Sequence, residues 1–101
     1  MRNSMTYVVI FKAQIQNLDA QYSEMAQHLR AKALSQFNCQ KFESLCELDQ
    51  EIALSYWHSL ADIQAWHLDA EHLVAQRLGK EKWYRHFSVE ICEVLKSYQS
   101  A

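Results

Sequence analysis

Two segments of the chain are apolar along consecutive residues, and they limit the folds that are open to it. Residues 7–11 read Tyr-Val-Val-Ile-Phe, and residues 52–57 read Ile-Ala-Leu-Ser-Tyr-Trp. β-Branched and aromatic residues of this kind favour strands. A strand with one solvated face alternates apolar and polar residues, so these runs predict strands that are covered on both faces.

A helix is predicted between these two strands. Asp19 is suited to cap its first turn, and it ends near Gln36. One face carries apolar residues at helical spacing, namely Tyr22, Met25, Ala26, Leu29 and Ala33. Residues 42–48 predict a further strand, which is joined to 52–57 by a short polar connection around Asp49 and Gln50. This spacing predicts a β-hairpin without the usual glycine.

The second helical region covers residues 60–66 and 69–78, with Ser59 as the expected N-cap of its first part. Gly79, the only glycine, suits a left-handed position at the end of the helix. Residues 87–91 then alternate apolar and polar side chains and predict a final strand. An extension of this strand as far as Tyr98, past an irregularity near Cys92, is also compatible with the sequence.

The resulting order, β-α-β-β-α-β, is the ferredoxin-like α+β plan, in which an antiparallel sheet carries its helices on one face. A chain of 101 residues is expected to form a single domain over residues 1–101. The other face of the sheet stays open in a monomer, although the strands are apolar there. An open apolar face of this size predicts an interface. We expect a homodimer through the open sheet face, with the two sheets curling into a dimeric α/β barrel.

Composition and charge exclude several classes of protein. Half of the residues are hydrophobic, which favours a packed core over disorder. A formal net charge of -2 argues against nucleic-acid binding. No apolar stretch approaches the roughly 18 residues of a membrane span, and the first residues contain no secretory signal. Without a CxxC pair, Cys39, Cys46 and Cys92 are expected to be free thiols that act as small buried hydrophobes in a reducing cytoplasm.

The segment from residue 55 to residue 84 is the place where a small-molecule site is expected. It contains all three tryptophans, three of the five histidines and the only glycine. Flat aromatic side chains and titratable imidazoles are common in such sites. Tyr56 and Trp57 point to opposite faces of their strand, so one is expected to face the helices and the other the dimer interior.

His72 is the best candidate for acid–base chemistry, because it lies inside this segment and an imidazole titrates near neutral pH. The alternative is a histidine that only forms hydrogen bonds with the backbone or the dimer partner. His67 and His72 are five residues apart, do not share a helix face as an i, i+4 pair does, and form no HExxH motif. A metal site is therefore disfavoured, even with Glu71 or His58 as additional ligands.

The remaining aromatic residues and glutamates each have a plain structural interpretation. Trp66 shares an apolar side of its helix with Leu60 and Ile63, so it belongs either to the core or to a pocket wall. Trp83 and Tyr84 either close a pocket or anchor the helix to the sheet. Three glutamates are expected to be solvated charges at strand edges, namely Glu43, Glu47 and Glu51.

Nearly the whole chain resembles the antibiotic biosynthesis monooxygenase domain of the dimeric α/β barrel superfamily. Beyond the order of elements, the resemblance rests on Ser55-Tyr56-Trp57-His58-Ser59-Leu60, Ala65-Trp66-His67, Glu71-His72, Ala75-Gln76-Arg77-Leu78-Gly79-Lys80 and Trp83-Tyr84. One departure is Ser35-Gln36-Phe37, which stands where many members carry a Pro-Gly-Phe element. The family includes cofactor-free quinone-forming oxygenases, heme-degrading enzymes and many proteins of unknown activity.

The resemblance also implies that heme degradation is disfavoured. That branch uses an asparagine on the first strand, a tryptophan on the second main helix and a histidine about ten residues later. Trp66 fits the tryptophan, but Gln76 stands where the histidine belongs, and residues 7–13 contain no asparagine. Glutamine is a poor iron ligand compared with imidazole. We therefore expect no cofactor, although His72, on a neighbouring turn, keeps heme binding open.

Two functions are compatible with the sequence. In the first, the protein is a small monooxygenase that oxidises an aromatic or quinol-type molecule with dioxygen, without metal or flavin. His72 would then accept a proton, and the substrate would contact Trp66, Trp83, His67 and Tyr56. In the second, the domain is a non-enzymatic dimeric module that binds a hydrophobic small molecule or heme. The residues alone do not select oxidation over another reaction.

Overall fold

The chain folds as four strands and three α-helices in the predicted order, in a computed structural model that describes residues 5–100. The elements are β1 (Tyr7–Ile15), α1 (Ala20–Gln36), β2 (Lys41–Glu47), β3 (Gln50–Trp57), α2 (Leu60–His67), α3 (Ala70–Leu78), a π-helical turn (Gly79–Trp83) and β4 (Tyr84–Glu93). Predicted and observed boundaries of most elements agree within one to three residues. None of the helices in residues 5–100 is long and apolar enough to cross a membrane.

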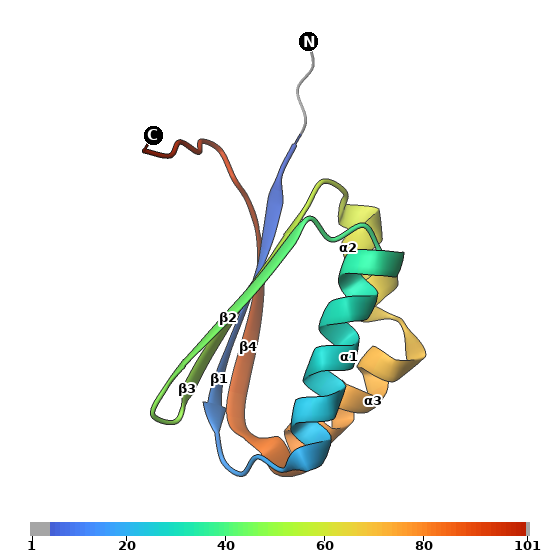
Figure 1. The fold of residues 1–101 in the computed structure, drawn as a ribbon, viewed down its shortest axis with the longest axis vertical. Helices are drawn as coiled ribbons and strands as arrows, with labels where there is room; N and C mark the ends of the chain where they lie inside the picture. Colours follow the sequence, from blue (N-terminus) through green and yellow to red (C-terminus); the bar gives the residue numbers. More distant parts are fainter. Residues whose placement is uncertain (1–4, 101) are drawn as a thin grey trace.

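The strands form one antiparallel sheet in the order β2-β3-β1-β4. Central strand β1 pairs with β3 and with β4, so that Phe11 lies between Ala53 on one side and Val89 on the other. Figure 1 shows the three helices packed as one layer against one face of the twisted sheet. The ferredoxin-like α+β plan is thus confirmed.

Alternation along the strands divides the sheet into a helix-covered face and an open face. Val9 and Trp57 point toward the helices and are buried with Leu29, Ile63 and Trp66 in the core. Their neighbours point the other way, and Ile10 and Leu54 form a cross-strand pair on the open face. The consecutive apolar residues of these strands therefore lie on two faces. Alternate residues pack in the core, and the others lie on the open face.

Side-chain caps begin all three α-helices. The Asp19 carboxylate accepts from the backbone N–H of Tyr22 at 2.8 Å, and the Ser59 hydroxyl accepts from that of Asp62 at 3.2 Å. Asp69 caps α3 by accepting from the Glu71 N–H. The predicted caps at Asp19 and Ser59 are confirmed. They satisfy N–H groups that have no partner inside the helix.

The predicted left-handed conformation of Gly79 is wrong. Gly79 has φ −59° and ψ −46°, and the helix continues through it into the π-helical turn. The reason for a glycine is space, because a Cβ atom at this position would lie 3.0 Å from Cδ2 of Tyr84. The only positive φ angles among residues 5–100 belong to Asn38 and Leu48. Leu48 makes the tight β2–β3 turn without a glycine.

Three smaller predictions also need correction. Strand β4 begins at Tyr84 and ends at Glu93, and its register shift lies opposite Gln14 and Ile15 instead of near Cys92. Leu60 is 52% exposed and does not share the buried side of Ile63 and Trp66. All three cysteines are free, but only Cys39 is buried, while Cys46 and Cys92 are exposed.

Candidate functional site

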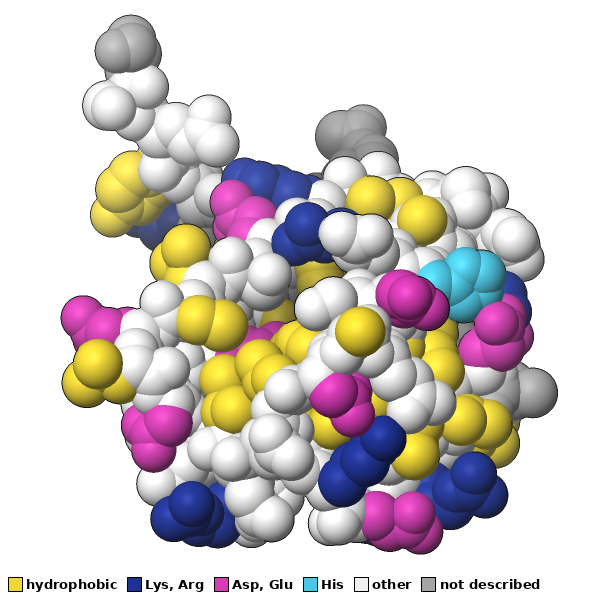
Figure 2. Space-filling model, turned by 60° about the horizontal axis from the view of Figure 1, so that its bottom comes forward, with side chains coloured by type: hydrophobic (Ala, Val, Ile, Leu, Met, Phe, Trp, Pro, Cys, Tyr) yellow, Lys and Arg dark blue, Asp and Glu magenta, His cyan; other side chains and the backbone are white. Residues whose placement is uncertain are grey.

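A cavity of about 200 Å³ lies between the helix layer and the covered face of the sheet. An apolar cavity of about 150 Å³ is large enough to bind benzene, so this one has room for a substituted aromatic ring. Met25 and Leu29 of α1, Phe42 of β2 and Val89 of β4 contribute to its apolar wall. Figure 2, in which the bottom of Figure 1 comes forward, shows hydrophobic side chains near the middle of the view with acidic and basic side chains around them.

Trp66 forms one end of the cavity and is only 6% exposed. Its ring lies 5.4 Å from that of Trp57, 6.0 Å from that of Phe42 and 4.2 Å from the imidazole of His72. These contacts place Trp66 in the core and on the cavity wall at once, so both readings of this residue apply. Its Nε1 is buried and has no hydrogen-bond partner among the described residues.

The geometry around His72 defines its tautomer. Nδ1 lies 3.1 Å from the backbone carbonyl oxygen of Trp66. A carbonyl only accepts, so Nδ1 carries the hydrogen in the neutral ring and Nε2 is the nitrogen able to accept a proton. Burial, with a smaller contribution from His67, lowers the pKa of His72 to about 4. The expectation that His72 titrates near neutral pH is therefore wrong, because the imidazole is neutral there.

His67 and His72 come together although their spacing does not suit one helix. The helix breaks at Leu68 and restarts after Asp69, which turns the chain between α2 and α3. The two imidazoles stack with centroids 5.1 Å apart and an interplanar angle of 29°. Both line the cavity. Within residues 5–100, no group of three or more His, Cys, Asp or Glu side chains is placed to hold a metal ion.

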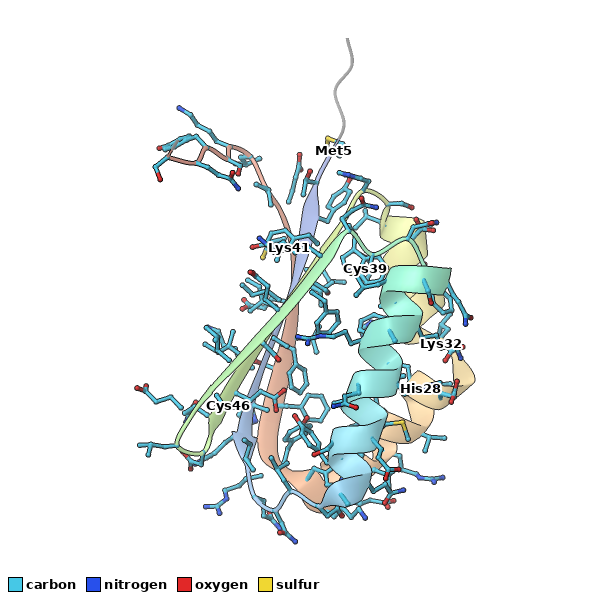
Figure 3. All side chains as sticks on the ribbon, in the orientation of Figure 1. Met5, His28, Lys32, Cys39, Lys41 and Cys46 are labelled. Atoms are coloured by element: carbon cyan, nitrogen blue, oxygen red, sulfur yellow. The ribbon has the colours of Figure 1, made fainter. Side chains whose placement is uncertain are left out.

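Ion pairs between α1 and the start of α3 hold this junction in place. Lys32 Nζ lies 2.9 Å from Asp69 Oδ2 and also contacts Glu71, whose other oxygen lies 2.7 Å from His28 Nε2. Figure 3 shows His28 and Lys32 along α1 near α3. The hydrogen bond from Lys32 lowers the pKa of Asp69, and the bonds to Glu71 and Asp69 raise that of Lys32. These contacts fix the chain between the two histidines.

Gln76 contributes a second unpartnered donor. It lies one helical turn beyond His72 on α3, so both side chains share a face and line the cavity. Gln76 Nε2 is buried without a hydrogen-bond partner among the described residues. Buried polar groups are nearly always paired in native proteins. Sequence reasoning treated Gln76 only as a missing histidine, although its i+4 spacing from His72 was visible.

Glu51 is the residue that sequence reasoning placed wrongly. It was expected to be a solvated charge, as Glu43 and Glu47 are, but it is 7% exposed and lines the cavity. It accepts a hydrogen bond from the hydroxyl of Tyr22. The sequence did contain a signal. Glu51 is an even number of positions from Ala53, Ser55 and Trp57, so it lies on the same face of the strand, which is the face toward the core.

Two tyrosines surround Glu51 at this end of the cavity. Burial and the hydrogen bond to Glu51 raise the pKa of Tyr22, and burial raises the pKa of Tyr84. Both phenols therefore stay protonated at neutral pH. The Tyr22 ring packs edge-on against Trp83 and Tyr84, at centroid distances of 5.2 and 6.1 Å.

Trp83 lines the cavity and also anchors the chain, although to the β1–α1 connection instead of to the sheet. Its ring lines the cavity, and it is 2% exposed. Its Nε1 donates to Asp19 Oδ1 at 3.2 Å, and its carbonyl accepts from the N–H of Gln16 at 2.8 Å. The π-helical turn is thereby anchored to the segment that leads into α1.

The structure does not bring Tyr56 together with the other candidate residues. Tyr56 pairs with Val8 and Lys41 on the open face of the sheet, and Lys41 Nζ lies 5.7 Å from its ring centroid. Trp57, the next residue, faces the helices. His72, Trp66, Trp83 and His67 thus share one cavity, whereas Tyr56 lies on the opposite side of the sheet.

The residues of the cavity fit a heme poorly. The Gln76 amide is a weak ligand for iron, although the bond from His72 Nδ1 to the Trp66 carbonyl leaves Nε2 of His72 free. The cavity of about 200 Å³ is also smaller than the roughly 300–1,000 Å³ of sites for drug-sized ligands. A porphyrin is larger than most such ligands, so a smaller aromatic molecule matches the site better.

Comparison with known proteins identifies the fold. A candidate antibiotic biosynthesis monooxygenase from Caulobacter crescentus superposes with a TM-score of 0.76 at 12% identity, over 92% of each chain. SnoaB, a cofactor-independent oxygenase from Streptomyces nogalater that was solved as a point mutant, gives a TM-score of 0.78 at 8% identity, over 94% of this chain and 98% of that chain. No protein-family model matches the chain.

The fold is therefore that of the antibiotic biosynthesis monooxygenases. Sequence similarity identifies a nearer group. The uncharacterised protein YqjZ of Bacillus subtilis is 33% identical over 89 residues, which are 87% of this chain and 78% of YqjZ. The chain belongs to the same family as YqjZ.

Proposed function

We propose that this protein is a small monooxygenase that oxidises an aromatic or quinol-type molecule with dioxygen. The observation that carries the proposal is the arrangement around His72. A half-buried neutral imidazole, with Nε2 as its accepting atom, shares an apolar cavity with two unpartnered N–H donors on Trp66 and Gln76. A proton acceptor beside donors for a developing oxyanion suits the activation of a phenolic hydroxyl group.

The low pKa of His72 makes it a weak base, so the donors have a necessary part in the reaction. His72 Nε2 accepts the hydroxyl proton, and the N–H groups of Trp66 and Gln76 stabilise the phenolate that forms. Because these groups are held in place by the fold, they lose little energy to reorganisation. Trp66 and Trp83 both line the cavity, and the imidazole of His67 stacks on that of His72.

Oxidation then proceeds with electrons from the substrate itself. A phenol and dioxygen give a quinone and water, in which one oxygen atom enters the ring and the other leaves as water. The phenol loses the four electrons that dioxygen gains, so neither a flavin nor a redox metal is required. The protein contributes deprotonation, orientation and exclusion of water.

Oxygen uptake tests this function. With hydroquinone under air, the wild-type protein is expected to consume dioxygen and form hydroxyquinone without hydrogen peroxide, so that catalase returns no oxygen. His72→Ala should lower kcat by about 10²-fold or more, the usual contribution of a general base. His58→Ala is the matched control, because His58 is exposed and contacts the carbonyl oxygen of Met5. Turnover unchanged in His72→Ala would remove this residue from the mechanism.

The pH profile gives an independent check. His72 must be neutral to accept a proton, and burial lowers its pKa to about 4. The acid limb of kcat/KM, which reports the free enzyme, should therefore lie near that pH. An exposed histidine would lose activity below about pH 6.5. Binding of hydroquinone or heme without oxygen uptake would instead favour the non-enzymatic binding module.

The proposal includes a homodimer through the open face of the sheet. It is supported by the apolar residues that this face carries on its central strands, Val8, Ile10, Ile52, Leu54 and Tyr56. Soluble monomers rarely leave such a patch uncovered. Tyr56 then belongs to the subunit interface and not to the substrate site.

A further inference from the structure

The polar groups of the cavity are divided between its two ends. Trp66 packs on Trp57 at one end of β3, and Glu51 lies at the other end of the same strand. Glu51 and Trp57 are six positions apart on the strand, which corresponds to roughly 20 Å. Gln76 lies between them, because α3 runs from His72, which contacts Trp66, toward Gly79, which lies against the Tyr84 ring. Trp66 Nε1 therefore marks one end of the cavity, the Glu51 carboxylate marks the other, and the Gln76 amide lies between them.

The carboxylate end has no positive charge within the cavity. No lysine or arginine occurs among the described residues that line it. Glu51 accepts from Tyr22, but a carboxylate has room for several hydrogen bonds and donates none. A second negative charge would meet repulsion in a place with little water to screen it, whereas a hydroxyl or amino hydrogen would find an acceptor.

We propose that Glu51 is a specificity-determining residue, which selects uncharged aromatic molecules with a hydroxyl or amino hydrogen at this end and rejects anionic ones. The rest of such a molecule extends along the apolar wall toward Gln76. This inference rests on the proposed function for the location of the site. It concerns binding, so it can be tested without turnover.

Four symmetric probes test it, since a molecule with two identical ends presents the same group to Glu51 in either orientation. Titration calorimetry without oxygen should show hydroquinone and 1,4-phenylenediamine binding more tightly than 1,4-dimethoxybenzene or terephthalate. The expected difference is about tenfold or more, the size of one hydrogen bond to a buried charged group. Comparison of the first two probes shows whether the hydroxyl or the amine is preferred. Equal affinity for hydroquinone and terephthalate would overturn the proposal.

Glu51→Gln should reduce the preference for hydroquinone over 1,4-dimethoxybenzene and over terephthalate by about tenfold each. The substitution removes the charge and supplies an amide donor. Glu47→Gln is the matched control, since Glu47 is an exposed strand carboxylate outside the cavity. Tyr22→Phe serves if Glu51→Gln does not fold. It frees Glu51 of its hydrogen bond and should enlarge the preference for hydroquinone over 1,4-dimethoxybenzene. Unchanged ratios in the folded variant would contradict the role of Glu51.

The outcomes separate this inference from the proposed function. Selective binding without oxygen uptake in the wild-type protein would support the role of Glu51 and contradict the oxygenation. Oxygen uptake without selectivity would support the oxygenation and contradict the role of Glu51.

Discussion

Single polar atoms inside the apolar cavity are the features that connect stability with function at the residue scale. An unpaired buried donor costs about 1–3 kcal/mol, and the cavity contains two, Trp66 Nε1 and Gln76 Nε2. Proteins retain such groups where binding needs them, at the expense of stability. A ligand with an acceptor oxygen would satisfy these donors and relieve that cost.

Gln76→Met should therefore make the ligand-free protein more stable. Methionine keeps the approximate volume of glutamine and removes the unpaired amide, so the free energy of unfolding should rise by about 1 kcal/mol. Affinity for hydroquinone should fall by about tenfold, because one donor is lost. Urea unfolding and titration calorimetry measure the two effects.

Gln64→Met is the control for this substitution, since Gln64 is an exposed residue of α2. It should change the free energy of unfolding by less than about 0.5 kcal/mol and leave affinity unaltered. A Gln76→Met variant that is less stable than the wild type would show that the amide has a structural partner.

Residue patterns predicted part of this site and missed the rest for identifiable reasons. The sequence concentrated attention on Trp66, His67, His72 and Trp83, which do share a cavity. The burial that sets the pKa of His72 depends on how α3 packs, which composition does not reveal. Glu51 was predicted to be solvated because it is charged, although its position in the alternation along β3 places it on the covered face. This alternation was the better guide, since it decides the face of the sheet.

The second helical region is the informative one at the scale of elements. Its first cap was visible in the sequence, because Ser59 precedes an apolar segment in the ordinary way, whereas the cap at Asp69 was not predicted. The π-helical turn after Gly79 was not visible, since it depends on contacts of Trp83 with Asp19 and Gln16 that are distant in sequence. Single π-helical turns are frequent at functional sites, and this one brings Trp83 and Tyr84 to the cavity.

Gly79→Ala should destabilise the protein although alanine favours helices. The gain in helix propensity is about 0.5–1 kcal/mol, but the new Cβ would lie 3.0 Å from Tyr84 Cδ2. The Tyr84 ring is held by Phe11 at 5.4 Å and Phe87 at 5.9 Å, so it has little freedom to move. Overpacking costs about 1–3 kcal/mol, which leaves a net loss of about 1 kcal/mol in urea unfolding.

Lys80→Ala provides the comparison, because Lys80 is the next residue of the same turn and is exposed. It should leave the unfolding midpoint close to that of the wild type. If Gly79→Ala proved as stable as Lys80→Ala, the Tyr84 ring would be able to move, and the steric reason for glycine would be wrong.

At the scale of the whole molecule, the open face of the sheet is the surface on which the expected subunit contact depends. The helices cover one face only (Figure 1), and the central strands place the cross-strand pairs Ile10–Leu54 and Val8–Tyr56 on the other. The β2–β3 hairpin extends this surface with Leu45 opposite Ile52, which are 78% and 43% exposed. The sequence predicted this surface correctly, because uninterrupted apolar runs are visible without knowledge of packing.

Leu54→Glu should convert the expected dimer to a monomer. The substitution places a charge on central strand β3 directly opposite Glu43, where a partner sheet would have to bury two like charges side by side. Sedimentation equilibrium should give twice the mass of one chain for the wild type and a single chain for the variant, with unchanged circular dichroism. Leu48→Glu is the matched control, because Leu48 lies in the hairpin turn and is 95% exposed. A wild-type monomer, or a Leu54→Glu dimer, would show that this face is not the contact between subunits.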